Sequence, residues 1–322
     1  MGKHVSNYEE MLENVDCNLC GNSDYEVVYH PQYERANTGN IVETFRSSGD
    51  EVLIDQLVRC KKCGLQYLNP RLRQEIILKG YSGGTDETFI SQIEGRERTF
   101  AKSLDLIEQI VPAKGKILDV GTAGGSFLGV ASKRGWDVIG CEPSKWLADW
   151  GSKHYNITIY PGTVFDMNIK DYSIDVVTLW DVLEHTPDPK AVLKECRRIL
   201  KPGGLLVVNY PDICSPIARL MGRKWVFLLS VHLYYFTFNT VKEMLRLTGF
   251  EVIKRKKHWQ TLELGYIFFR MKAYISGLAN IGSKIIKTLG MEKVQIPYWI
   301  GQTLVISRSS QDNKTLSVRR LN

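Results

Sequence analysis

Residues 116–143 constrain the fold of this 322-residue chain more than any other stretch. A short apolar segment at 117–120 leads directly into a glycine-rich turn at 121–125, and a segment with helical apolar spacing follows at 126–134. Glycines at such a turn let backbone N–H groups approach a ligand closely. Glu142 ends the next apolar segment, about 20 residues beyond the turn, where units of this type hold the hydroxyls of a ribose. The stretch therefore predicts one nucleotide-binding edge of a parallel sheet.

The same alternation continues downstream. Segments typical of helices and of buried strands follow one another at 144–154 (helix), 157–160 (strand), 175–180 (strand), 188–200 (helix) and 205–209 (strand). Strands that alternate with helices of this length predict an α/β domain with a parallel sheet, whose ligands lie at the carboxyl ends of the strands.

Two matched cysteine pairs precede this domain. Cys17 and Cys20 form one pair and Cys60 and Cys63 the other, each with two residues between the thiols and a glycine after the second. That spacing lets four sulfurs meet one tetrahedral ion and leaves no open coordination position, so it predicts a structural zinc ribbon. A redox couple is the alternative, although two like pairs are redundant for disulfide exchange. The other three cysteines, Cys141, Cys196 and Cys214, are isolated and typical of core thiols.

Several classes of protein are disfavoured by the rest of the sequence. The first residues lack the apolar core of a signal peptide, and no run of 18 apolar residues predicts a membrane-spanning helix. Cysteine pairs without export signals indicate a reducing compartment, so we expect the cytoplasm.

The positive charge of the chain is concentrated near its C-terminal end. Nine Lys or Arg and three Glu lie between Glu251 and Lys293, in a chain whose formal net charge is +7. A wide apolar stripe with helical spacing occupies 262–289 within this region. A basic amphipathic helix suggests contact with a membrane surface or an anionic nucleotide-sugar. The alternative is a lid or dimer-forming helix with a solvated polar face.

Three motifs together resemble a known family. Asp119, Gly121 and Gly125 match the first motif of class I S-adenosylmethionine-dependent methyltransferases, in which Ala123 replaces the middle glycine. Alanine fits there provided that the position needs no positive φ. The strings WDVLEHTPDP (180–189) and LKPGG (200–204) are similar to those of the branch that includes ubiquinone-type and sugar methyltransferases. The cysteine ribbon and the later HLYYFT string resemble a sub-branch found with deoxysugar and cell-surface glycan pathways. If the glycine-rich turn at 121–125 is considered without the other motifs, a dehydrogenase is the alternative.

The resemblance implies a domain plan. It consists of a zinc ribbon (1–78), a connecting helix that covers the cofactor cleft (79–112), a Rossmann-like methyltransferase domain with helices on both faces of the sheet (113–308), and a disordered tail (309–322). A helical insertion at 262–289 precedes the last strand.

The resemblance also implies which residues bind S-adenosylmethionine. The predicted cofactor-binding residues lie at the ends of successive strands: Asp119, Gly121, Thr122, Ala123 and Gly125 near the methionine moiety, Glu142 and Pro143 at the ribose, Thr163 and Val164 at the adenine, and Trp180 and Asp181 at the amino-acid end. Carboxylates accept bonds from ribose hydroxyls or an ammonium group, and backbone amides donate to a carboxylate.

The catalytic group is less constrained. The sulfonium already activates the methyl group, so the protein needs only to align the acceptor and remove its proton. His232 is our first candidate for the base, His185 the second, and an ordinary pKa near neutrality would suit either. Asp181, Glu184 and His185 also resemble a metal cluster of ubiquinone-type and small-RNA methyltransferases, with His232 as a fourth ligand for a divalent cation.

The expected activity is O- or C-methylation of a sugar, a nucleotide-sugar, a glycan precursor or a related small metabolite. RNA methylation is a second interpretation, suggested by the ribbon and the basic pI. However, the charge does not cluster on the ribbon, so nucleic acid is an unlikely partner. The third is a non-catalytic cofactor-binding protein or zinc-ribbon adaptor. The sequence does not indicate an oligomeric state.

Overall fold

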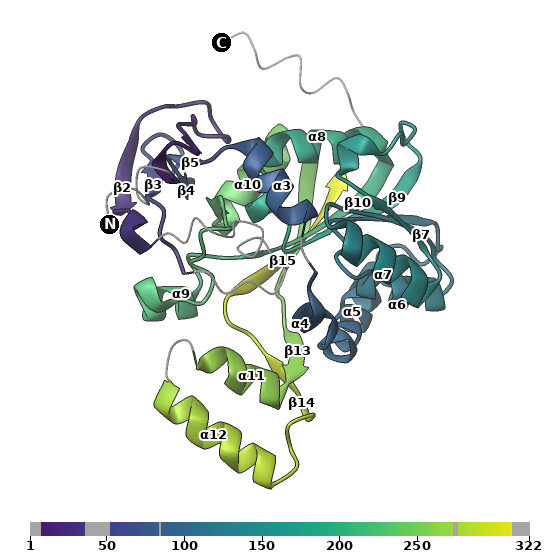
Figure 1. Cartoon of the computed structure of the whole chain (residues 1–322). Helices are drawn as coiled ribbons and strands as arrows, with labels where there is room; N and C mark the ends of the chain where they lie inside the picture. Colours follow the sequence, from purple (N-terminus) through teal and green to yellow (C-terminus); the bar gives the residue numbers. More distant parts are fainter. Residues whose placement is uncertain (1–7, 36–51, 84, 273–275, 311–322) are drawn as a thin grey trace.

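A seven-stranded mixed sheet forms the centre of the computed structural model, which describes residues 8–35, 52–83, 85–272 and 276–310 (Figure 1). The strands, in spatial order, are β12 (Phe250–Lys257), β15 (Gln302–Ser309), β10 (Leu200–Pro211), β9 (Ile174–Trp180), β6 (Lys116–Val120), β7 (Asp137–Glu142) and β8 (Thr158–Pro161). The five strands from β10 to β8 pair in parallel, whereas β15 is antiparallel to both of its neighbours. The predicted Rossmann-like α/β sheet is confirmed.

Both faces of the sheet are covered by helices because consecutive strand residues point to opposite sides. Ile117 and Val176 share a core with α5 (Ile93–Glu108), α6 (Ser126–Lys133) and α7 (Lys145–Tyr155). Leu118 and Val177 lie in the opposite core, with α3 (Gln74–Ser82), α8 (Pro189–Ile199) and α10 (Phe238–Leu247). This arrangement confirms the prediction of helices on both faces.

The helical segment that precedes β6 is divided into two helices. The Asp86 side chain accepts a bond from the Phe89 backbone N–H and caps α4 (Glu87–Ile90), after which α5 begins at Ile93. Further helical elements outside the insertion are the short α9 (Pro216–Met221) and the 3-10 turns η1 (Tyr33–Arg35), η2 (Val164–Asp166), η3 (Leu183–His185) and η4 (Gly222–Lys224).

The cysteine ribbon is joined to the large domain by a shared sheet. Strands β2 (Tyr25–Tyr29), β3 (Leu57–Cys60) and β4 (Gln66–Leu68) pair antiparallel, and the fourth strand is β11 (Tyr234–Tyr235) from far along the chain. Strands β1 (Leu12–Glu13) and β5 (Arg71–Leu72) form a separate pair. One apolar core contains residues of the ribbon and of the large domain, so the ribbon is packed against the fold rather than tethered to it.

The insertion before the last strand contains two helices instead of one continuous stripe. Strands β13 (Gln260–Glu263) and β14 (Gln295–Tyr298) pair and frame α11 (Leu264–Met271) and α12 (Ser276–Thr288). The two helices project away from the central sheet (Figure 1). Among the described helices, none is long and apolar enough to cross a membrane. The predicted tail, 309–322, lies outside the described residues from 311 onward, while Ser309 belongs to β15.

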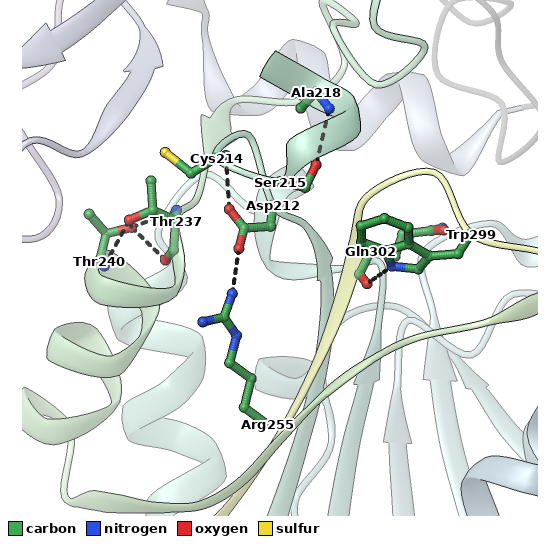
Figure 2. Close-up of polar contacts among 9 residues, drawn as sticks. All are labelled: Asp212, Cys214, Ser215, Ala218, Thr237, Thr240, Arg255, Trp299 and Gln302. Carbon is green, nitrogen blue, oxygen red and sulfur yellow. Dashed lines mark hydrogen bonds and ion pairs between the residues drawn. The ribbon is translucent and has the colours of Figure 1, made fainter. Parts of the chain in front are cut away.

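The carboxyl end of β10 is anchored by a buried acid (Figure 2). One oxygen of Asp212 accepts a bond from the Cys214 backbone N–H at 2.9 Å, and the other pairs with Arg255 of β12 at 3.1 Å. Nearby, the Trp299 indole donates to the Gln302 carbonyl where the chain returns from the insertion. The Asp212–Arg255 pair joins β12, which precedes the insertion, to the carboxyl end of β10, whereas the Trp299–Gln302 bond closes the local turn that follows β14.

Candidate functional site

The turn after β6 is in a left-handed conformation at three positions. Gly121, Ala123 and Gly125 have φ values of 66°, 47° and 76°. A Cβ atom at Gly121 would also lie 2.8 Å from Val182 Cγ2, so this position excludes a side chain. The expectation that Ala123 avoids a positive φ is wrong: alanine occupies a conformation that costs an L-residue roughly 1–2 kcal/mol.

Glu142 holds this turn in place. Its carboxylate accepts 2.8 Å hydrogen bonds from the backbone N–H groups of Ala123 and Ser144. Burial raises the pKa of Glu142 to about 7. A carboxylate has about four acceptor sites, so two remain for ribose hydroxyls. Pro143, which follows it, is partly buried at the predicted ribose edge.

Asp119 lies on β6 just before the turn, and Thr122 is the second residue of the turn. Asp119 is buried and accepts a 2.6 Å bond from the Thr178 hydroxyl of β9, and burial raises its pKa to about 7. Thr122 is also buried. The Asp119 side chain thus links β6 to the neighbouring strand β9.

The predicted adenine loop follows β8. Thr163 and Asp166 form a reciprocal cap, in which Asp166 accepts bonds of 2.7 Å from both the backbone N–H and the hydroxyl of Thr163. Val164 is buried, whereas the adjacent Phe165 is exposed. The cap gives the loop a defined shape at the carboxyl edge of the sheet, where the sequence predicts the adenine.

Trp180 and Asp181 end β9. The Trp180 ring packs against Phe100 and Phe127 at centroid distances of 5.2 and 5.1 Å. Asp181 has a φ of 52° and accepts bonds from Asn209 at 2.6 Å and Gln260 at 3.3 Å. Burial raises the pKa of Asp181 to about 6 despite these partners.

Arg96 is a residue of this site that the sequence reasoning missed. It lies on α5, and its guanidinium group stacks over Phe89 at 3.7 Å from the ring centroid. Burial lowers the pKa of Arg96, and Asp181 and Tyr298 act on it electrostatically. Tyr298 donates a 2.5 Å bond to Gln260, so the strands that frame the insertion contribute two side chains to the same polar group. The sequence signal that could have identified Arg96 is its basic side chain on the helix that we expect to cover the cofactor cleft.

A second group of polar side chains lies beyond the turn. Single ligand-type atoms of Glu184, His185 and His232 all lie within 4.8 Å of one another. Neither carboxylate oxygen of Glu184 has a hydrogen-bond partner among the described residues, although the side chain is buried. Asp181, which the sequence placed in this cluster, is not part of it, because its carboxylate is held by Asn209 and Gln260.

Backbone carbonyls orient both imidazole rings. His232 Nδ1 lies 2.8 Å from the Phe227 carbonyl oxygen, and His185 Nδ1 lies 3.0 Å from that of Val231. The Tyr81 hydroxyl from α3 is also 2.8 Å from His185 Nδ1. A ring that donates from Nδ1 keeps a lone pair on Nε2, which is the usual state of a histidine that binds a metal. Tyr81 is a second residue that the sequence reasoning missed.

The electrostatics of this cluster differ from the expectation of ordinary histidines. Burial lowers the pKa of His185 to about 4, and burial together with His185 lowers that of His232 well below its usual value. Burial and the nearby Asp181 raise the pKa of Glu184. The expected pKa near neutrality is therefore wrong for both histidines, and at neutral pH each is an uncharged acceptor.

The four ribbon cysteines form one compact group. Cys17 and Cys63 sulfurs lie 3.4 Å apart, Cys20 and Cys60 sulfurs 3.5 Å, and all four lie within 4.8 Å of one another. Both knuckle turns close with bonds from a glycine N–H, Gly21 to the Cys17 carbonyl and Gly64 to that of Cys60. Four thiols in this arrangement suit a tetrahedral thiophilic ion such as zinc.

The ribbon contacts the loop that follows the histidine cluster. Arg71 donates 2.9 Å bonds to the Pro187 carbonyl and to the Tyr234 hydroxyl, and Tyr234 in turn bonds to Pro187. Leu233, immediately after His232, donates to the Glu184 carbonyl at 2.7 Å. The ribbon thus packs directly against both segments that carry the cluster.

Comparisons with known sequences identify the large domain. A family model described as a methyltransferase domain matches residues 93–255, which are 163 of the 322 residues. The ubiquinone biosynthesis O-methyltransferase of Coxiella burnetii is 37% identical over 133 residues, covering 38% of this chain and 56% of that protein. Its counterpart in Aliivibrio fischeri is 35% identical over 97 residues, covering 28% and 41%. The chain thus spans 56% and 41% of the lengths of these two curated relatives.

Solved structures with a similar backbone include two methyltransferases. A Thermotoga maritima S-adenosylmethionine-dependent methyltransferase, described as a possible histamine N-methyltransferase, has a TM-score of 0.46 and 21% identity and covers 68% of this chain and 91% of its own. Haemonchus contortus phosphoethanolamine N-methyltransferase 2, bound to S-adenosylmethionine, has a TM-score of 0.44 and 15% identity, covering 68% and 57%.

The matched region runs from α5 to β12 and includes the glycine turn, Glu142 and the Trp180–His185 segment. It covers half of the chain and contains the parallel strands of the sheet. The chain therefore belongs to the class I S-adenosylmethionine-dependent methyltransferase family.

Proposed function

We propose that this enzyme transfers the methyl group of S-adenosylmethionine to a hydroxyl oxygen of a small-molecule acceptor. The names of the relatives support oxygen rather than carbon as the acceptor atom. The acceptor class that we propose is a sugar, a nucleotide-sugar, a glycan precursor or a related small metabolite. The observation that carries the proposal is the buried, unpaired carboxylate of Glu184 between two neutral histidines.

The cofactor would lie across the carboxyl ends of β6 to β9. In this arrangement Glu142 accepts the ribose hydroxyls, the 163–164 loop contacts the adenine, and the turn at 121–125 faces the methionine moiety. Arg96 is placed to pair with the cofactor carboxylate, and Asp181 with its ammonium group, because opposite charges would then meet in a desolvated pocket.

Glu184, His185 and His232 fit a divalent cation. A buried carboxylate with no partner is costly unless something neutralises it, and the two rings keep Nε2 available because Nδ1 faces a carbonyl. A divalent cation in such a site acidifies a bound hydroxyl. Asp181 is not one of the ligands, since Asn209 and Gln260 hold it elsewhere.

The chain's own groups would orient the acceptor and hold its proton. A neutral imidazole accepts a hydrogen bond from a hydroxyl, so in the metal-free cluster His232 Nε2 would position the acceptor oxygen and take its proton as the methyl group transfers. With a divalent cation bound, the same lone pair would be a ligand, and the cation would acidify the acceptor hydroxyl instead. The Tyr81 hydroxyl and the Val231 carbonyl hold the His185 ring in its orientation. The site would also have to align the acceptor oxygen with the methyl carbon at about 3–3.5 Å.

The ribbon cysteines are proposed to bind zinc as a structural ion. The closed set of four thiols leaves no position for a substrate, so the ion would stabilise the fold rather than react. Zinc content measured after extensive dialysis, compared between the wild type and Cys60→Ser, tests this assignment. We expect close to one equivalent in the wild type and its loss in the variant.

Two measurements test the proposed reaction. Calorimetry should show that the protein binds S-adenosylmethionine without any acceptor present. Screening hydroxylated sugars, nucleotide-sugars and phenols for methyl transfer should then identify an O-methylated product. Exclusive formation of C- or N-methylated products would contradict the proposal while leaving the cofactor assignment intact.

A further inference from the structure

The helix α12 has apolar side chains on two separate sides. One side faces α11: Ala279 and Ile286 are buried, and a Cβ atom at Gly282 would lie 2.0 Å from the ring of Phe268. The close approach at Gly282 shows that the two helices pack tightly. The contact with α11 therefore accounts for the burial of this side of α12.

The second side of α12 is an exposed aliphatic stripe. Leu278, Ile281, Ile285 and Leu289 are spaced by three or four residues, which places them along one line of the helix. Their exposed fractions are 64%, 60%, 54% and 64%. Together with Phe269 of α11, exposed by 55%, they are the largest group of exposed apolar side chains on the insertion. Isolated exposed apolar residues need no explanation, whereas a continuous stripe indicates a partner.

Basic side chains accompany this stripe. Lys272, Lys284, Lys287 and Lys293 are exposed, and none of them forms an ion pair within the described part of the chain. The segment 264–294 contains five basic residues and a single acid, Glu292. Lysine stems can lie along apolar surface while the ammonium groups reach outward. The insertion therefore combines an apolar surface with an uncompensated positive charge.

We propose that the stripe 278/281/285/289 and its lysines bind the surface of a membrane that contains anionic lipids. An amphipathic helix with lysines on its polar side can lie in the interfacial plane with its apolar side among the acyl chains. At about 20 Å, α12 is long enough to lie flat on the surface but too short to span it. A second copy of the chain fits less well, because it would bring the same excess of positive charge to the interface.

The position of the insertion agrees with this role. α11 and α12 project from the body of the molecule, so α12 can contact a flat surface (Figure 1). The paired strands β13 and β14, which flank the two helices in the chain, carry Gln260 and Tyr298, which belong to the polar group around Asp181. Binding of a surface by the insertion is independent of the chemistry at the cluster, so it can be tested without an acceptor.

Sedimentation with lipid vesicles tests the proposal on the full-length chain. We expect the wild type to bind vesicles that contain phosphatidylglycerol and not vesicles of pure phosphatidylcholine. Replacing two exposed stripe residues, Ile281→Asn with Ile285→Asn, should weaken binding at least about tenfold, because apolar area is lost. Lys284→Glu with Lys287→Glu should weaken it by a similar factor through charge.

Leu220→Asn is the matched control. Leu220 is 88% exposed on α9, outside the insertion, so its replacement should leave vesicle binding within twofold of the wild type. Unchanged affinity for S-adenosylmethionine, measured by calorimetry, would show that each variant is folded. Wild-type protein that fails to bind anionic vesicles would overturn the proposal. So would a dimer, detected by light scattering, that the Ile281→Asn/Ile285→Asn variant dissociates, since the stripe would then bind a second copy.

Discussion

Asn18 in the first cysteine turn donates a 2.9 Å hydrogen bond to Asp188, which lies 170 residues away in the sequence. The same Asn18 accepts a bond from the Lys190 backbone N–H, and Asp188 caps α8 by accepting from the Ala191 N–H. Because α8 follows directly after η3, these bonds connect the ribbon to the segment that carries Glu184 and His185.

Replacing this link should affect catalysis more than cofactor binding. Asn18→Ala removes both bonds to the 188–190 segment, which we expect to lower stability by about 1–2 kcal/mol and methyl-transfer kcat several-fold. Affinity for S-adenosylmethionine should stay within twofold, because the cofactor residues lie on other loops. Arg59→Ala is the control, since it removes a solvent-exposed ion pair with Glu26 on the same ribbon. Equal losses in both variants would indicate a general loss of ribbon stability instead.

Glu184→Gln should separate metal binding from cofactor binding. The variant removes a buried carboxylate that has no partner among the described residues, so we expect the metal-free protein to become more stable. Affinity of the cluster for a divalent cation should fall at least about tenfold and activity should fall with it. Calorimetric titration with Mn²⁺, on protein with its ribbon zinc intact, measures the first effect. Full activity in Glu184→Gln after removal of other metals would contradict the metal assignment.

The pH dependence of stability should report Glu142. Burial raises its pKa from 4.5, the ordinary value of a solvated glutamate, to about 7 in the fold, so the folded state binds the proton more tightly than the unfolded state. The stability that this group contributes is complete below pH 4.5 and is lost as the pH rises through 7. Glu142→Gln lacks this loss. Denaturant titrations of the cofactor-free proteins measure this effect. As the pH rises from about 4.5 to 8, the free energy of unfolding of the wild type should fall by about 3 kcal/mol relative to that of the variant.

Ala123→Gly should stabilise the protein. Alanine at this position has a φ of 47°, which glycine adopts without strain, and the gain is partly offset by the entropy of glycine in the unfolded chain. We expect a net gain of about 0.5–1 kcal/mol and a rise in Tm of a few degrees. Ala101→Gly in the interior of α5 is the control and should lose roughly 1 kcal/mol. A decrease in Tm for Ala123→Gly would show that the Cβ atom makes a favourable contact.

Arg96→Met should weaken cofactor binding. The guanidinium is desolvated next to Asp181 and Tyr298, where it can pair with the cofactor carboxylate, and we expect a loss of about ten- to hundredfold in affinity for S-adenosylmethionine. Arg98→Met on the same helix removes only an exposed ion pair with Glu94 and should change the affinity less than twofold. Affinity of Arg96→Met for the cofactor equal to that of the wild type would place the carboxylate elsewhere.

The predictions that succeeded rest on local patterns. The strands and helices of the large domain follow the apolar spacing of the sequence, and the helix 144–154 coincides with α7 capped by Ser144. The four cysteines were grouped by their spacing alone and lie within one cluster. Each of these features depends on residues close in the sequence, or on a side-chain type with few alternative uses.

Most of the predictions that failed concern the burial of polar groups. The others are Ala123, whose φ is positive, Cys214, which is exposed rather than in the core, and 262–289, which forms two helices. The sequence placed Asp181 with Glu184 and His185. In the structure, Asp181 has a left-handed backbone conformation, and its carboxylate is bound by Asn209 and Gln260 instead of joining that cluster. The histidines were expected to titrate near neutrality, yet burial lowers their pKa values. Arg96 was not identified, because its role depends on which side of α5 faces the pocket.

The sequence by itself determined the family, the strand–turn–helix unit at which we propose that the cofactor binds, and the grouping of the four ribbon cysteines, because these depend on local spacing and on glycine conformation. Only the tertiary structure decided that Asp181 lies outside the cluster of Glu184, His185 and His232, that β11 completes the ribbon sheet, and that the aliphatic stripe of α12 is exposed. These features arise from contacts between distant segments and from desolvation, neither of which a one-dimensional pattern contains.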